Sequence, residues 1–157
     1  MPLHKGFQYI CNIVDCFSRF AFGIACKTKS ATEISKFVLS YIYLYGAPSI
    51  LQSDNGKEFR NSHLTEVVIQ FDTVQMHGIP YHPQSQGRVE RFNRKLTEYC
   101  RIKMSERSDW SDQLPELYYA YNNRLNKAIR PKTPYQLFFS RPNFAVLLAD
   151  QVSSLLE

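Results

Sequence analysis

The sequence predicts an α/β fold in which helices flank a mixed β-sheet. Two β-rich apolar runs, Phe7–Val14 and Phe20–Cys26, stand near the start, and helical and extended segments alternate after them. With 157 residues the chain has the length of one domain, enough to bury a core without a disulfide or a metal ion. Hydrophobic residues make up 44% and charged residues 21%, a composition that excludes disordered and fibrous proteins.

The sequence shows neither a membrane-spanning segment nor a secretion signal. No apolar run approaches the length of a membrane-spanning helix, and Met1–Gly6 does not resemble the start of a signal peptide. The four cysteines have neither CxxC pairing nor zinc-site spacing, so we expect reduced, mostly buried thiols. These features predict a nuclear or cytoplasmic protein with no membrane partner.

The first elements are predicted by turn and capping signals. The short link Asp15–Arg19 favours a hairpin between the two apolar runs. Ser30 and Glu33 have the spacing of a capping box, which predicts the start of a helix that Gly46 ends. Its apolar residues recur at helical spacing.

The remaining elements follow the same logic of periodicity and breakers. They are expected as a strand at Ile50–Ser53, a helix at Glu58–Gln70, a strand at Thr73–Gly78, a loop at Ile79–Gln86, a long helix from near Gly87, a helix at Trp110–Leu125 broken at Pro115, and a short turn at Pro134–Phe139.

Positive charge is concentrated on the predicted long helix. The net charge is +5, and the segment Arg88–Arg107 has seven basic residues against three acidic ones. Its apolar residues share one arc (Val89, Phe92, Leu96, Tyr99 and Cys100), and a polar arc holds Glu90, Asn93, Arg94, Thr97 and Arg101. Such a face suits a polyanion, although a solvated helix face has the same pattern.

Two carboxylates stand where a divalent cation could be bound. Asp54 follows a predicted strand, and thirty-five residues separate it from Glu90, at the expected start of the basic helix. Oxygen ligands of this kind suit Mg²⁺. The alternatives are a turn role for Asp54, within Asp-Asn-Gly, and compensation of the helix dipole by Glu90.

The surrounding residues resemble a known family. Ser53–Phe59 (SDNGKEF) is similar to the second catalytic Asp motif of retroviral and retrotransposon integrases, and Tyr81–Asn93 is similar to their active-site loop and the helix that bears the catalytic Glu. Further matches lie in Tyr9–Phe20, and Ala120–Asn122 with Thr133–Tyr135 are typical of the gypsy-type branch. The resemblance spans about residues 6–142.

The resemblance implies an RNase H-like fold and a DNA partner. It also implies Mg²⁺- or Mn²⁺-dependent DNA end processing and strand transfer, with Asp54 and Glu90 as catalytic metal ligands. We expect residues 1–108 to form the catalytic core and 109–157 a trailing helical segment of the same core. Integrase cores generally pair, so a homodimer is expected.

The family's first catalytic Asp has no match in this chain. It lies on a first strand that precedes the segment from Lys5 onward, where too few residues stand and none is acidic. Asp15 matches a hairpin position that is not catalytic. We therefore expect the first strand to be missing, the metal to bind weakly, and the chain to be inactive alone. The integrase zinc-binding and C-terminal DNA-binding domains are not recognised either.

The DNA-binding candidates lie in the loop and on the basic helix. For each, a solvated side chain is the alternative. They are His82, Gln86, Arg88, Asn93, Arg94 and Arg101. Aromatic residues around Trp110 are expected to pack in the core rather than to stack on bases.

Two rival functions remain open on these residues. One is a non-catalytic nucleic-acid or protein-binding module built on the same fold, since fold does not determine function. The other is a dimerisation unit. Retention of both Asp54 and Glu90 favours the integrase interpretation over the non-catalytic module, which would not need to keep both.

Overall fold

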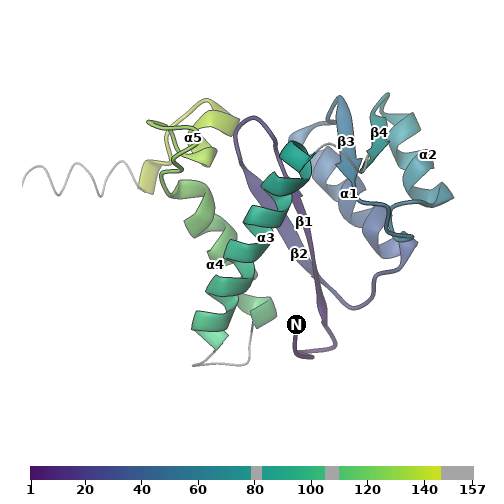
Figure 1. Cartoon of the computed structure of the whole chain (residues 1–157), viewed down its shortest axis with the longest axis horizontal. Helices are drawn as coiled ribbons and strands as arrows, with labels where there is room; N and C mark the ends of the chain where they lie inside the picture. Colours follow the sequence, from purple (N-terminus) through teal and green to yellow (C-terminus); the bar gives the residue numbers. More distant parts are fainter. Residues whose placement is uncertain (79–82, 105–109, 146–157) are drawn as a thin grey trace, which may run out of the picture. The chain divides into compact units, whose positions relative to one another are not determined.

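The computed structural model describes residues 1–78, 83–104 and 110–145, and Figure 1 labels its elements. In chain order they are β1 (Tyr9–Val14), β2 (Ala21–Cys26), α1 (Ala31–Tyr45), β3 (Ile50–Ser53), α2 (Ser62–Gln70), β4 (Val74–His77), α3 (Pro83–Met104), α4 (Trp110–Asn123) and α5 (Pro134–Phe139). Helices and strands interleave, which confirms the predicted α/β class.

The chain divides into two compact units. The first comprises Met1–Cys11 with Ile24–Ser111, and the second Asn12–Gly23 with Asp112–Glu157. The described strands form two separate two-stranded sheets, β1–β2 and β3–β4. The antiparallel and parallel pairings that a mixed sheet combines are both present. The β1–β2 pair is antiparallel and the β3–β4 pair is parallel.

The β1–β2 hairpin is antiparallel, as predicted. Gln8 N donates to Cys26 O (3.0 Å) at one end, and Asp15 N donates to Phe20 O (2.8 Å) at the other. Cys26 is fully buried, and burial together with the nearby charge of Glu33 raises the pKa of its thiol to about 11. The thiol therefore stays protonated at neutral pH.

Helix α1 begins and ends where the sequence predicts, but its capping box is only half formed. Ser30 Oγ accepts from Glu33 N (3.3 Å), whereas the Glu33 carboxylate accepts from Lys27 N and Thr28 N instead of from Ser30. Gly46 ends the helix with a φ of 92°, in the left-handed region that favours glycine.

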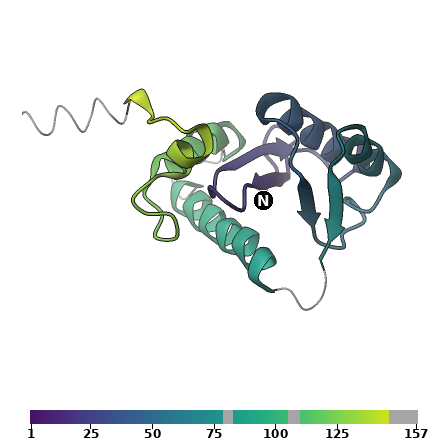
Figure 2. The ribbon, with the colours of Figure 1, turned by 90° about the horizontal axis from the view of Figure 1, so that it is seen from above.

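Strands β3 and β4 run parallel, with Ile50 opposite Val74 and Ser53 opposite His77. Figure 2 shows the two arrows pointing the same way. Helix α2 packs against both α1 and β4. The prediction that this helix starts at Glu58 was wrong, because Asn61 caps it by accepting from Leu64 N (2.9 Å) and the preceding residues form a turn.

Helix α3 starts earlier than the predicted Gly87. Pro83 begins it, a residue whose fixed φ suits the first helical turn. Glu90 therefore lies about two turns inside the helix, too far from its start to compensate the dipole there. Phe92 and Leu96 are buried as the predicted apolar arc requires. Of the predicted loop, residues 79–82 lie outside the described residues.

The second unit is built on a hydrogen-bonded asparagine and stacked aromatic rings. Asn122 Nδ2 donates to Ala21 O (2.8 Å), and its Oδ1 accepts from Ala21 N (2.9 Å). The rings of Phe20 and Phe138 stack at 4.3 Å. Pro115 does not break α4, contrary to the prediction, and it stands inside the helix.

Two further predictions concern burial. Trp110 and Tyr118 are buried in the core, as predicted for the aromatic residues of this region, although Tyr119 is exposed. Among the described residues, none of the helices has the length and hydropathy needed to cross a membrane.

Candidate metal and nucleic-acid site

The carboxyl ends of β3 and β4 meet at Asp54. Because these strands are parallel, the residues that follow them emerge at the same edge of the sheet, where α/β proteins commonly bind ligands. Gly78 N donates to Ser53 O (2.8 Å), and Asn55 Nδ2 donates to Gly78 O (3.1 Å). Ser53 Oγ lies 3.3 Å from Nδ1 of His77. These contacts hold the backbone on both sides of Asp54.

Asp54 is exposed at the start of a tight turn. Its Oδ1 accepts from Gly56 N (2.9 Å), while Oδ2 accepts no hydrogen bond from the described residues. A Cβ at Gly56 would lie 2.7 Å from Oε2 of Glu58 and 2.9 Å from Oδ1 of Asp54, so a larger residue here would displace one of the two carboxylates. The turn therefore combines an Asx turn with an open carboxylate oxygen.

Glu58 and His77 were missed by the sequence analysis. Glu58 belongs to the same motif as Asp54, and the four-residue spacing within a turn was the signal for it. His77 is found only through the register, which places it opposite Ser53. Both side chains add polar atoms close to Asp54.

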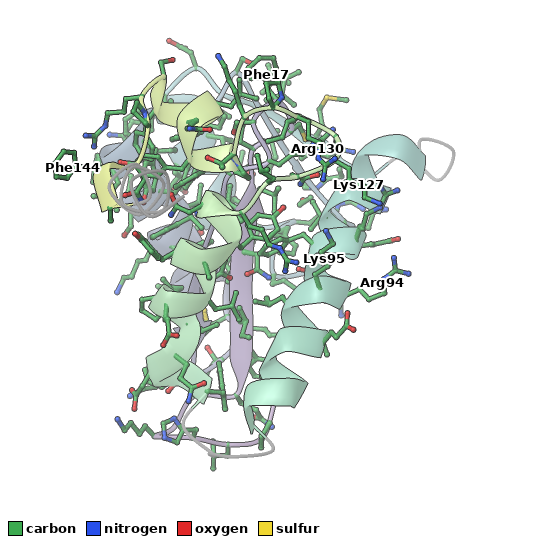
Figure 3. The ribbon with its side chains drawn as sticks, turned by 90° about the vertical axis from the view of Figure 1, so that its left-hand side faces the viewer. Phe17, Arg94, Lys95, Lys127, Arg130 and Phe144 are labelled. Atoms are coloured by element: carbon green, nitrogen blue, oxygen red, sulfur yellow. The ribbon has the colours of Figure 1, made fainter. Side chains whose placement is uncertain are left out.

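Glu90 lies on the exposed polar face of α3. Asn93, Arg94 and Thr97 follow it at helical spacing, and all are exposed. Thr97 Oγ1 donates to the Asn93 carbonyl (2.8 Å). Arg94 and the neighbouring Lys95 extend from this helix in Figure 3, and neither makes an ion pair with a described residue.

The other predicted DNA-binding residues are placed by backbone only, or not at all. Gln86, Arg88 and Arg101 belong to α3, but their side chains lie outside the described residues. His82 lies outside them altogether.

The described residues contain no group of three or more His, Cys, Asp or Glu side chains placed to hold one metal ion. Asp54 and Glu90 make no hydrogen bond to each other. Exposed carboxylate oxygens nevertheless have the chemistry that Mg²⁺ and Mn²⁺ require, with water completing the coordination. The donor set fits a hard divalent cation.

Asp15 has a structural position in the hairpin turn. Its Oδ2 accepts from Ser18 N (2.7 Å) and from Ser18 Oγ (2.5 Å), and its carbonyl accepts from Arg19 N (2.9 Å). Arg19 adopts a φ of 65°. These bonds organise the turn.

The family model described as "Integrase core domain" matches residues 1–83, more than half of the chain and including Asp54. The chain belongs to the integrase core domain family. This family serves DNA integration and generally depends on a divalent metal.

Curated relatives are long polyproteins. The retrovirus-related Pol polyprotein from transposon 412 of Drosophila melanogaster is 29% identical over 89% of this chain, and the Gag-Pol polyprotein of feline leukemia virus is 30% identical over 90%. The chain spans only 12% and 8% of these relatives.

Solved structures agree on the fold. The catalytic core domain of BIV integrase superposes with a TM-score of 0.72 at 25% identity, covering 83% of this chain and 85% of that one. A chain of a simian T-cell lymphotropic virus intasome gives a TM-score of 0.71, also at 25% identity, and covers 86% of this chain and 49% of that one. The RNase H-like fold of integrase cores is thereby confirmed.

Proposed function

We propose that this chain supplies the DNA-binding and metal-holding parts of an integrase core, with Mg²⁺ or Mn²⁺ held weakly by Asp54 and Glu90. The observation that carries the proposal is the position of Asp54, exposed at the joined ends of two parallel strands with Oδ2 open. A metal bound there would stabilise the negative charge that develops on oxygens during phosphoryl displacement.

DNA would lie along the polar face of α3. Arg88, Arg94 and Arg101 would contact phosphates, which position the duplex without reading its sequence. Asn93 would donate to a phosphate or base beside Glu90, and Gln86 with His82 would approach the DNA end. The exposure of Arg94 and Asn93 supports this path.

The reaction class is DNA end processing followed by strand transfer. Two positions of this chain match the family's three carboxylates. The carboxylate of Asp15, the other candidate that the sequence offers, already accepts two hydrogen bonds from Ser18. We therefore expect no strand transfer by residues 1–157 alone. A misplacement of about 1 Å in such a site can already cost on the order of a hundredfold in rate.

A strand-transfer assay with Mn²⁺ tests this expectation. Activity that persists in Asp15→Asn would show that two carboxylates are sufficient. Activity that is lost in Asp15→Asn would instead assign the third position to Asp15.

The DNA path is tested by the salt dependence of duplex binding. Replacing Arg94 and Arg101 by Ala should reduce the slope of log K against log salt by roughly two if each neutralises one phosphate. Lys29→Gln with Lys36→Gln removes two exposed charges near and on α1 and should leave the slope unchanged. An unchanged slope in the α3 variant would exclude that face from the DNA path.

Self-association is a second part of the proposal. It is supported by the intasome among the structural relatives, an assembly that contains a similar chain. We expect a homodimer in sedimentation velocity at micromolar concentration, and a monomer at all concentrations would contradict this part alone.

A further inference from the structure

A second basic segment lies between α4 and α5. Between Glu116 and Asp150 the sequence has no acidic residue and five basic ones. The remaining fourteen basic and fourteen acidic residues of the chain balance, so this segment accounts for the whole net charge of +5. Four of its cations stand in the connection between the two helices: Arg124, Lys127, Arg130 and Lys132.

These four side chains are exposed, and their charges are available to a ligand. None of them makes an ion pair or a side-chain hydrogen bond with a described residue. Lys127 and Arg130 both extend from the connection in Figure 3. Four like charges within nine residues of sequence repel one another, and a polyanion relieves that repulsion.

The connection is also ordered by its own hydrogen bonds. Ile129 N donates to Asn126 O (3.0 Å), and Lys132 N donates to Ile129 O (3.2 Å). Asn143 Nδ2 donates to Asn123 Oδ1 (2.8 Å), which closes the segment at its base. A surface that is already ordered loses less conformational entropy on binding.

Arg19 adds a further positive charge to the same unit. Its Nη1 is buried without a hydrogen-bond partner in the part of the chain that the structure describes. Burial raises the pKa of Tyr121, and the charge of Arg19 and the side-chain hydrogen bond with Asn126 oppose that rise. Arg19 therefore lies close enough to Tyr121, two residues before the connection's Asn123–Arg124 start, to act on it electrostatically.

We propose that the connection Arg124–Lys132 is a second phosphate-binding surface, which takes the backbone of duplex DNA. Exposed cations of this number suit the dense charge of a duplex, which is about one negative charge per 1.7 Å of axis. The proposal goes beyond the proposed function, which places DNA on α3 and uses none of these residues. Contacts of this kind carry no sequence information.

The test compares salt slopes of duplex binding for two pairs of variants. Lys127→Gln with Arg130→Gln should reduce the slope by roughly two, since each phosphate contact contributes about 0.9 to it. The matched control Lys29→Gln with Lys36→Gln should leave the slope unchanged. Both replaced pairs are exposed, so thermal unfolding should show an unaltered fold in every variant.

The outcomes separate this proposal from the one for α3. An unchanged slope in Lys127→Gln with Arg130→Gln overturns the second surface, even if the Arg94 and Arg101 variant shows its own loss. A reduced slope in the connection variant supports it, even if the α3 variant behaves like wild type. A combined variant whose slope falls by roughly four would show that both surfaces act in one complex.

Discussion

Asn122 holds the backbone of Ala21 as a neighbouring strand would, with one donor and one acceptor. Both residues are buried, so the two backbone groups have no access to water. The gypsy-type match at Ala120–Asn122 is therefore explained by packing rather than by chemistry. Tyr118 completes this region by donating to Oδ1 of Asn12, against Gly23, where any side chain would clash with the Tyr118 ring.

Asn122→Ala should strongly destabilise the protein. It leaves the N–H and C=O of Ala21 buried without partners, at about 1–3 kcal/mol each. Urea unfolding should show a loss of roughly 2–5 kcal/mol. The adjacent Asn123→Ala removes hydrogen bonds that are less buried and should cost less than about 1 kcal/mol. Equal losses in the two variants would contradict this role.

We expect the ionisation of Glu33 to make the stability of the fold depend on pH. Burial raises the pKa of its carboxyl, but hydrogen bonds from Thr28 and Lys27 and the Lys27 charge outweigh it, so the pKa lies below its ordinary value of 4.5. A depressed pKa contributes stability above the ordinary value, and that stability is lost as pH falls through the folded-state pKa.

The stability difference between wild type and Glu33→Gln should therefore be present at pH 7 and shrink as the pH falls below 4.5. Because Glu33 is only partly buried, solvent screening keeps the difference small. Glu66→Gln, which is exposed on α2, should show no such trend. If the stability difference between wild type and Glu33→Gln did not change with pH, these hydrogen bonds would not be the cause of it.

The sequence predicted Asp54 as a site residue but not Glu58 or His77, and the reason is physical. A strand followed by Asp-Asn-Gly is a local pattern, so the position of Asp54 at a strand end could be predicted. The placement of His77 depends on the pairing of β3 with β4, and that register is set by contacts between residues 24 positions apart. The approach of Glu58 to Asp54 depends on the turn at Gly56.

Helix α3 shows what periodicity can and cannot determine at the scale of an element. Phe92 and Leu96 set the buried side of the helix, and the sequence predicted that side. Its start could not be predicted from the sequence. Gln84, Ser85 and Gln86 are polar and show no helical periodicity of apolar residues, and glycine, as at Gly87, commonly interrupts helices. Similarly, the strands were predicted from composition, but their division into two sheets depends on tertiary contacts.

Gly87→Ala tests where α3 begins. Inside a helix, alanine is more favourable than glycine by about 0.5–1 kcal/mol, and a Cβ at Gly87 would meet no atom within 4 Å. Thermal unfolding should therefore show stabilisation. Gly46→Ala, at a φ of 92°, should destabilise. Destabilisation by Gly87→Ala would support the later helix start that the sequence favoured.

At the scale of the whole molecule, we propose that one ion connects Asp54 with Glu90. Asp54 follows β3 and Glu90 lies on α3, so an ion held by both carboxylates would link these two elements. Binding to the folded state stabilises it, by about 1.4 kcal/mol when the ion is at ten times its Kd. A weakly held ion should therefore raise Tm by a few degrees at millimolar concentration.

The most direct test is the shift in Tm caused by Mn²⁺ in wild type, Asp54→Asn, Glu90→Gln and the double variant. If the two carboxylates share an ion, each single variant should lose most of the shift and the double variant should lose no more. Glu66→Gln is the charge-matched control and should keep the shift. A shift that survives in Glu90→Gln but disappears in Glu58→Gln would contradict a shared ion, because it would assign the ion to the turn around Gly56 instead.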